Sequence, residues 1–154
     1  MTDQSDVRHD HIEIVDDGPV IRATVKLGNC PPDRALAAFT DPELLASWWG
    51  GELTINPEVG GVYSIWFPKV PASLVGLVVR NVPGDAFEFS WAWEHEPDSP
   101  DRTVSVTVGT NGDGTELAIV HGPHGAGDAE ATARTAHRDG WEYFLPRLHA
   151  ALAA

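Results

Sequence analysis

Large aromatic side chains alternate along the segment AFEFSWAWE, residues 86–94. Phe87, Phe89, Trp91 and Trp93 occupy every second position. Successive side chains of a β-strand point to opposite faces, so the four rings share one face. So many rings on one strand predict either a well-filled core or an aromatic wall on which a flat ligand stacks. Both interpretations can hold together, because the wall of a pocket is also part of the core.

Three histidines are candidates for a polar or metal-binding role. His121 and His124 have H-x-x-H spacing, but the segment VHGPHG suggests a strand end and a loop rather than a helix, and no cysteine lies nearby. We therefore predict no metal site and no cofactor. His121 lies on the same face of its strand as Leu117 and Ile119. It is therefore expected to point into the cavity as a hydrogen-bonding group. His137 precedes Trp141 by one turn and is expected at the pocket edge or in solvent.

Motifs for nucleophilic or nucleotide chemistry are absent from the sequence. The chain has no G-x-S-x-G, no P-loop and no G-x-G-x-x-G. Its single cysteine, Cys30, has no identifiable base partner. No catalytic residue is assigned, and binding is favoured over catalysis.

Charge and composition restrict the partners. The 154 residues include 23 acidic and 10 basic ones, for a formal net charge of −13. Such a chain is repelled by nucleic acid and by anionic membranes, where affinity comes from lysine and arginine. No apolar run approaches the ~18 residues of a membrane span, and the N-terminus has no signal-peptide core. With one cysteine, the sequence predicts a cytoplasmic protein. The acidity favours solubility; docking of a basic protein partner is the alternative.

The elements that must position these residues follow from periodicity. Residues 20–27 alternate as a half-buried strand, and a short helix to Phe39 follows. A second short helix starts at Thr40, whose spacing to Glu43 fits a capping box, or at Asp41, and it ends at Gly50. Strands separated by turns fill 52–122, and a long helix spans 128–154.

The N-terminal segment and the packing complete the predicted fold. Residues 1–17 are expected to form an acidic polar tail, in which HIEIV could add a short strand, and 18–154 a single domain. The fold class is α+β, with a curved antiparallel sheet of about six to seven strands wrapped around the last helix. The small helix face at Ala133, Ala136 and Gly140 predicts a space against the sheet. In VYSIWF the odd positions Tyr63, Ile65 and Phe67 are expected to face it.

The adjacent pair Trp48–Trp49 ends the second short helix. Where the chain leaves helical geometry, neighbouring side chains can diverge. We expect Trp49 to pack in the core and Trp48 to lie near the cavity mouth.

Four motifs, in order, resemble a known superfamily: TDPELLASWW, GG before VYSIWF, LAIVHG and HRDGWEYFLPRL. Over roughly residues 18–152 the chain resembles the START-like helix-grip superfamily of polyketide cyclase and Bet v 1-like proteins. Within it, the chain is most similar to the subgroup named after the C-terminal domain of the Hsp90 ATPase activator. The Asp41-Pro42…Trp48-Trp49 block and Gly140-Trp141, followed by Leu145 and Leu148, are the most specific residues.

The resemblance implies a hydrophobic cavity between the sheet and the last helix, but no single reaction. We expect non-catalytic carriage or sequestration of a hydrophobic, aromatic or polyketide-like small molecule, in antibiotic biosynthesis or self-resistance of the enediyne type. In that last case a glycine beside the cavity would be cleaved, and the glycines considered are Gly122, Gly125, Gly127 and Gly140. A co-chaperone-like interaction module and an aromatase/cyclase-like enzyme are the alternatives, and the chain is a monomer or a homodimer. The expected ligand-binding residues are Trp48, Tyr63, Ile65, Phe67, Phe89, Trp91, Trp93, His121, Ala133, His137 and Trp141.

Overall fold

A computed structural model describes residues 6–8, 11–49, 51–112 and 114–153. The strands are β1 (Asp6–Arg8), β2 (Ile12–Asp17), β3 (Val20–Gly28), β4 (Leu53–Ile55), β5 (Val62–Phe67), β6 (Ala72–Val82), β7 (Ala86–Trp93), β8 (Arg102–Asn111) and β9 (Gly114–Gly122). The helices are α1 (Pro32–Thr40), α2 (Pro42–Trp48) and α3 (Asp128–Ala153). None of these helices is long and apolar enough to cross a membrane.

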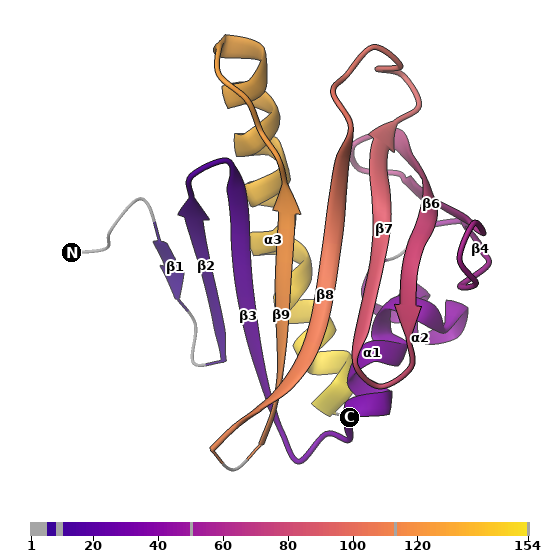
Figure 1. Ribbon diagram of the computed structural model, residues 1–154, viewed down its shortest axis with the longest axis vertical. Coiled ribbons are helices and arrows are strands. Elements are labelled where there is room, and N and C mark those ends of the chain that lie inside the picture. The colour runs from indigo at the N-terminus through magenta and orange to yellow at the C-terminus, as the bar shows by residue number, and fades with distance from the viewer. Residues whose placement is uncertain (1–5, 9–10, 50, 113, 154) are drawn as a thin grey trace.

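All described strands belong to one antiparallel sheet in the order β1-β2-β3-β9-β8-β7-β6-β5-β4. In Figure 1 this sheet lies in front of α3, which runs along its inner face, and α1 and α2 lie beside the C-terminal end of α3. The α+β class, the long final helix and the two short helices after the early strand are confirmed.

The sheet has more strands than the expected six to seven. The additional ones come from the N-terminal segment that the sequence assigned to a polar tail, with a strand at HIEIV as an option. Ile12 and Ile14 share one face of β2 and are buried, and β2 pairs with β3. The β1 strand then pairs with the outer edge of β2.

Local chemistry determines where α2 starts and how the chain turns after it. Of the two predicted helix starts, Asp41 is the one used: its Oδ1 accepts from the Glu43 N–H at 3.1 Å, and Pro42 follows it. After the helix, Gly51 adopts φ +75°, and a Cβ there would lie 1.7 Å from the carbonyl oxygen of Trp66. Only glycine fits this turn.

Strand parity places the core as the sequence predicts. Tyr63, Ile65 and Phe67 of β5 are buried, whereas Trp66 on the opposite face is 39% exposed. Along α3 the buried stripe is Trp141, Leu145, Leu148 and Leu152. The face of α3 that carries Ala133, Ala136 and Gly140 lacks large side chains, and there the sheet and α3 leave a space.

Candidate functional site

An apolar cavity of about 130 Å³ lies between β7 and the middle of α3. It is lined by Trp49, Phe67, Val70, Trp91, Trp93, Ala136, His137, Gly140, Trp141 and Phe144. A cavity of about 150 Å³ is large enough to bind benzene. This inner cavity therefore accommodates about one aromatic ring.

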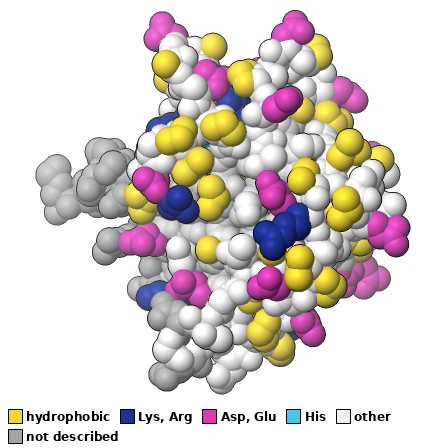
Figure 2. Space-filling view, viewed as in Figure 1, with side chains coloured by type: hydrophobic (Ala, Val, Ile, Leu, Met, Phe, Trp, Pro, Cys, Tyr) yellow, Lys and Arg dark blue, Asp and Glu magenta, His cyan; other side chains and the backbone are white. Residues whose placement is uncertain are grey.

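Two larger grooves share walls with the inner cavity. The loop-side groove, about 610 Å³, runs between residues 95–100 and the first turns of α3. Figure 2 shows a notch at the top of the molecule between these two projecting parts, which Figure 1 identifies as the loop after β7 and the start of α3. The tyrosine-side groove, about 430 Å³, leads the other way past Tyr143. Because Val70 and Ala136 line all three spaces, they form one cleft.

Both adjacent tryptophans are buried in the core, so the expectation for Trp49 is confirmed, whereas the expectation that Trp48 lies near the cavity mouth is wrong. Trp48 is fully buried, and its indole N–H donates to the Ala38 carbonyl at 2.7 Å, away from the cavity. Trp49 lines the cavity and meets the rings of Trp141 and Trp91 at 5.7 and 6.1 Å between centroids. The two indoles stack on each other, with 4.8 Å between their ring centroids.

The structure divides the expected ligand-binding residues into two groups. Those lining the inner cavity or the loop-side groove are Phe67, Trp91, Trp93, Ala133, His137 and Trp141. Those that line none of the three spaces are Trp48, Tyr63, Ile65, Phe89 and His121. Tyr63 and Phe89 stack at 4.1 Å, and the Tyr63 hydroxyl donates to the Phe39 carbonyl at 2.7 Å. Strand parity correctly predicted which face of β5 and β7 is buried. However, α1 and α2 cover part of that face, so some of its residues lie in the core and do not line the cavity.

Sequence reasoning missed three residues of the inner-cavity wall, Trp49, Val70 and Phe144. Phe144 is half-buried, and its ring meets those of Phe67 and Trp49 at 5.6 and 6.4 Å. Its position seven residues after His137 and four after Gly140, on the helix face that meets the cavity, is the signal that could have revealed it.

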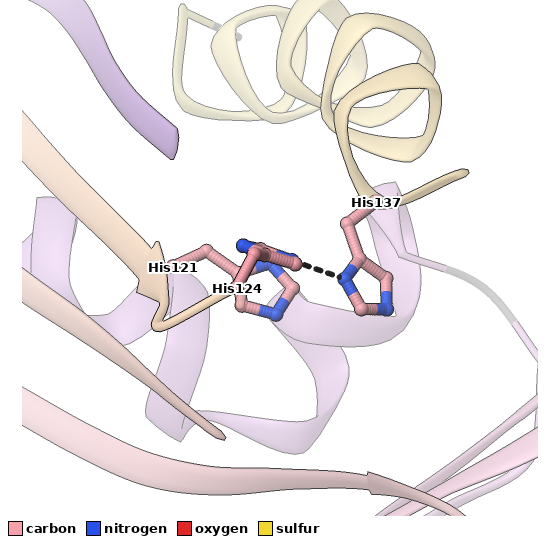
Figure 3. Close-up of side chains that lie close together, drawn as sticks. All are labelled: His121, His124 and His137. Atoms are coloured by element: carbon pink, nitrogen blue, oxygen red, sulfur yellow. Dashed lines mark hydrogen bonds between the residues drawn. The ribbon is translucent and has the colours of Figure 1, made fainter. Parts of the chain in front are cut away.

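Three buried histidines lie together at the cavity wall (Figure 3). His137 lines the cavity, and His121 and His124 lie behind it. His121 comes from the end of β9, His124 from the following loop and His137 from α3, and one nitrogen of each lies within 4.8 Å of the others. The loop is held by the His124 backbone N–H, which donates to the Pro19 carbonyl at 2.6 Å. From the sequence, only His121 and His124 were grouped together, by their spacing. Their approach to His137 on α3 depends on the path of the loop, which has no periodicity.

Tryptophan donors fix the protonation of these rings, because an indole N–H can only donate. Trp141 donates to Nδ1 of His121 at 3.0 Å, so the proton of that ring is on Nε2. Trp93 donates to Nε2 of His137 at 3.2 Å, so His137 donates from Nδ1 to Nε2 of His124 at 2.9 Å. All three rings are neutral in this network.

Burial and neighbouring charge favour the neutral rings. Burial first, then the other two histidines, hold the pKa of His121 well below its usual value. The pKa of His137 falls to about 3, chiefly through burial and then through His124. Burial and the guanidinium of Arg102 lower the pKa of His124.

Three buried hydrogen-bond donors in and beside the histidine cluster have no partner in the described part of the chain. In the described part of the chain, the buried side-chain nitrogens without a partner are Nε1 of Trp91, Nε2 of His121 and Nδ1 of His124. Each carries a proton in the network above. Unpaired buried donors cost free energy and are unusual in a core optimised only for stability, so this wall is a candidate functional region.

A largely buried ion pair lines the loop-side groove. Both amino groups of Arg102 on β8 donate to the carboxylate of Glu130 on α3, at 2.7 and 2.8 Å. The same carboxylate accepts from the Gly125 N–H at 2.8 Å. These bonds, Arg102 first, lower the pKa of Glu130 to about 2. The pair fixes the start of α3 against the sheet.

The histidine cluster offers the donor set that zinc accepts, but its hydrogen bonds do not fit a metal centre. A metal-bound imidazole donates its second N–H to an acceptor. At His121 and His137 that second nitrogen instead faces an indole N–H. If a metal were bound, an imidazole N–H and an indole N–H would face each other at both histidines in a buried site. The arrangement therefore fits a network of neutral rings without a metal.

Residues 29–153 match the family described as "Activator of Hsp90 ATPase homolog 1-like protein". The chain belongs to this family. The match covers the cavity, both grooves and the histidine cluster, and it agrees with the subgroup resemblance seen in the sequence.

Solved structures of low sequence identity share the fold. MLL2253 from Mesorhizobium loti is 21% identical with a TM-score of 0.74, over 86% of this chain and 96% of that one. DynU16, a protein in the dynemicin biosynthetic locus, is 24% identical with a TM-score of 0.71, over 88% of this chain but only 48% of that one. The Aha1 dimer from Colwellia psychrerythraea is 20% identical with a TM-score of 0.68, over 87% and 96%. No protein of curated function matches the sequence.

Proposed function

We propose that this member of the Activator of Hsp90 ATPase homolog 1-like family binds a flat, hydrophobic small molecule and carries or sequesters it without chemical change. The observation that supports this most is the apolar cavity walled by Trp49, Trp91, Trp93 and Trp141. Aromatic walls favour a flat ring system, because such rings stack or pack edge to face. The cavity takes about one ring, and the rest of the molecule extends into the grooves.

Titration with a neutral aromatic alcohol tests this proposal. We expect 2-naphthalenemethanol to quench the tryptophan fluorescence and to give a saturable heat in calorimetry, since several indoles line the site. Gly140→Leu should abolish both signals by filling the cavity: Gly140 lines it, and a Cβ there would meet nothing within 4 Å. Ala150→Leu, at an exposed position of the same helix that lines none of the three spaces, is the matched control. No binding by the unmodified protein would refute the proposal.

A narrower form of this function is antibiotic self-resistance, in which the cavity holds a reactive molecule. The source locus of DynU16 supports a setting in antibiotic biosynthesis. Of the glycines considered for cleavage, Gly122, Gly125, Gly127 and Gly140, the last lines the inner cavity. Intact-mass analysis after exposure to an activated enediyne should show cleavage at Gly140 and none in Gly140→Leu. An unchanged mass would leave simple binding as the function.

A co-chaperone-like function is the second candidate, and the family description supports it. The exposed apolar residues Val62, Trp66, Leu77 and Val79 lie on the outer face of β5 and β6, where a protein partner could dock. Stimulation of a bacterial Hsp90 ATPase by the chain, lost in Trp66→Ala and Leu77→Ser but kept in Gly140→Leu, would favour this function over small-molecule binding.

A further inference from the structure

The tyrosine-side groove ends at two cations on a chain that has few. The sequence has two lysines and eight arginines against 23 acidic residues. Lys69, just after β5, and Arg147, on α3, both line this groove. In the described part of the chain neither forms an ion pair with a carboxylate.

Tyr143 holds the two cations together. The Lys69 Nζ donates to the Tyr143 hydroxyl oxygen at 2.8 Å and lies 4.7 Å from the ring centroid. The Arg147 guanidinium carbon lies 5.6 Å from the same centroid. Arg147 is anchored from behind, because its Nε donates to the Trp48 carbonyl at 3.0 Å. The Lys69 bond and charge lower the pKa of the Tyr143 hydroxyl, which strengthens it as a donor.

Donors therefore remain available at this mouth. The ammonium of Lys69 has three N–H groups and uses one on Tyr143, the phenol O–H is not used by that bond, and the terminal amino groups of Arg147 are not used on Trp48. Such a group of donors matches a carboxylate or a phenolate. The lone carboxylate that lines this groove is Asp139.

The opposite end of the cleft has the opposite charge. The loop-side groove is lined by Glu96, Asp98 and Glu130, and its one arginine, Arg102, is already paired with Glu130. An anionic group is repelled there and attracted at Tyr143. The cleft therefore has a negatively charged end and a positively charged end, with the apolar inner cavity between them.

We propose that the ligand is an amphipathic anion, an aromatic ring system bearing a carboxylate or phenolate, whose charged group binds at Lys69, Tyr143 and Arg147 while its rings occupy the inner cavity. This inference rests on the proposed small-molecule binding and adds the chemical class and orientation of the ligand. It also gives the otherwise unpaired cations a partner.

Two probes that share one ring system test this inference separately from the function. At low salt, 2-naphthoate should bind about tenfold more tightly than the neutral 2-naphthalenemethanol, because charge-assisted hydrogen bonds add to the same ring contacts. The preference should shrink toward onefold in 0.5 M salt. Equal affinities at low salt would overturn the inference and leave the proposed function intact, whereas no binding of the neutral probe would overturn the function itself.

Substitutions then locate the anion. The acid preference is the ratio of the affinities for 2-naphthoate and 2-naphthalenemethanol. Lys69→Gln should remove most of this preference, and Tyr143→Phe, which keeps the ring, should reduce the preference about threefold. Both residues are exposed, so the fold should tolerate the changes. Lys26→Gln is the matched control, since Lys26 is the other lysine and lies on β3, with four strands between it and β5. A full acid preference in Lys69→Gln, or its loss in Lys26→Gln, would place the anion elsewhere and refute the inference.

Discussion

At the scale of the residue, Trp48 and Trp49 differ in what their indoles contact. Trp48 holds the Ala38 carbonyl by a buried hydrogen bond, whereas Trp49 forms a wall of the cavity. Trp48→Phe should therefore lower the free energy of unfolding by about 1–3 kcal/mol, because a buried carbonyl loses its donor. Trp49→Phe should instead chiefly weaken binding of 2-naphthalenemethanol, because it removes part of the stacking surface.

Urea unfolding and calorimetric titration of both variants separate the two effects. Trp66→Phe, on the exposed face of β5, is the control and should change neither quantity. Weaker probe binding in Trp48→Phe, with normal binding in Trp49→Phe, would show that the roles are assigned the wrong way round.

A glycine on the cavity wall gives the second prediction at this scale. Gly140 lies inside α3, its φ is not positive, and an added Cβ meets nothing within 4 Å. Gly140→Ala should raise the free energy of unfolding by about 0.5–1 kcal/mol, because glycine is the poorer helix former. The methyl group also enters the cavity, so affinity for the neutral probe should fall.

The reciprocal change, Ala136→Gly, is the matched control, since Ala136 lies one turn earlier and lines the same cavity. Chemical denaturation should show it to be less stable by a similar amount. A destabilised Gly140→Ala would mean that the space beside this glycine is filled in solution.

At the scale of the element, the ion pair Arg102–Glu130 joins β8 to the first turns of α3. Its side chains are largely buried, 5% and 15% exposed. Glu130→Gln should lower the melting temperature by several degrees, because Arg102 is left buried without its counter-charge. The double variant Arg102→Leu/Glu130→Leu should recover part of the loss, since it leaves no buried charge.

The exposed pair Arg22–Asp17 is the matched comparison for that experiment. Its side chains are 57% and 56% exposed, so Asp17→Asn should leave the melting temperature nearly unchanged. Thermal unfolding followed by circular dichroism measures all three variants. If Asp17→Asn lowered the melting temperature as much as Glu130→Gln, burial would not explain the contribution of the Arg102–Glu130 pair to stability.

Periodicity predicted most elements, because alternation and helical spacing are local properties of the sequence. It did not predict β1, because Asp6–Arg8 contains a single apolar residue and shows no alternation. It also could not show how far α1 and α2 extend over β5 and β7. For this reason Phe89 and Tyr63 lie in the core while Trp91 and Trp93, on the same strand face, line the cavity.

The histidine cluster shows the same limit. Strand parity correctly turned His121 inward, and helical spacing placed His137 one turn before Trp141. Their meeting with His124 depends on the path of a loop that no repeat in the sequence encodes. The identity of the residues on a face was therefore predictable, and the contacts made at the ends of elements were not.

At the scale of the whole molecule, stability should depend on the neutral state of the buried histidines. Their pKa values are lowered in the folded protein, whereas in the unfolded chain they are near the usual 6.5. As pH falls below about 6.5, the unfolded chain takes up protons that the folded rings refuse. The contribution to stability is therefore complete above pH 6.5 and is lost progressively toward pH 3, the approximate pKa of His137.

The loss should reach on the order of 1 kcal/mol for His137 by pH 5.5, before most carboxylates titrate. Urea unfolding at pH 7.5, 6.5 and 5.5 measures it. His137→Gln, which can still accept from Trp93 and donate to His124, should show a shallower fall with pH, and exposed His95→Gln should follow the unmodified protein. A fall of the same steepness in His137→Gln would assign the acid sensitivity to other groups, whereas constant stability over this range would mean that the rings accept protons without unfolding.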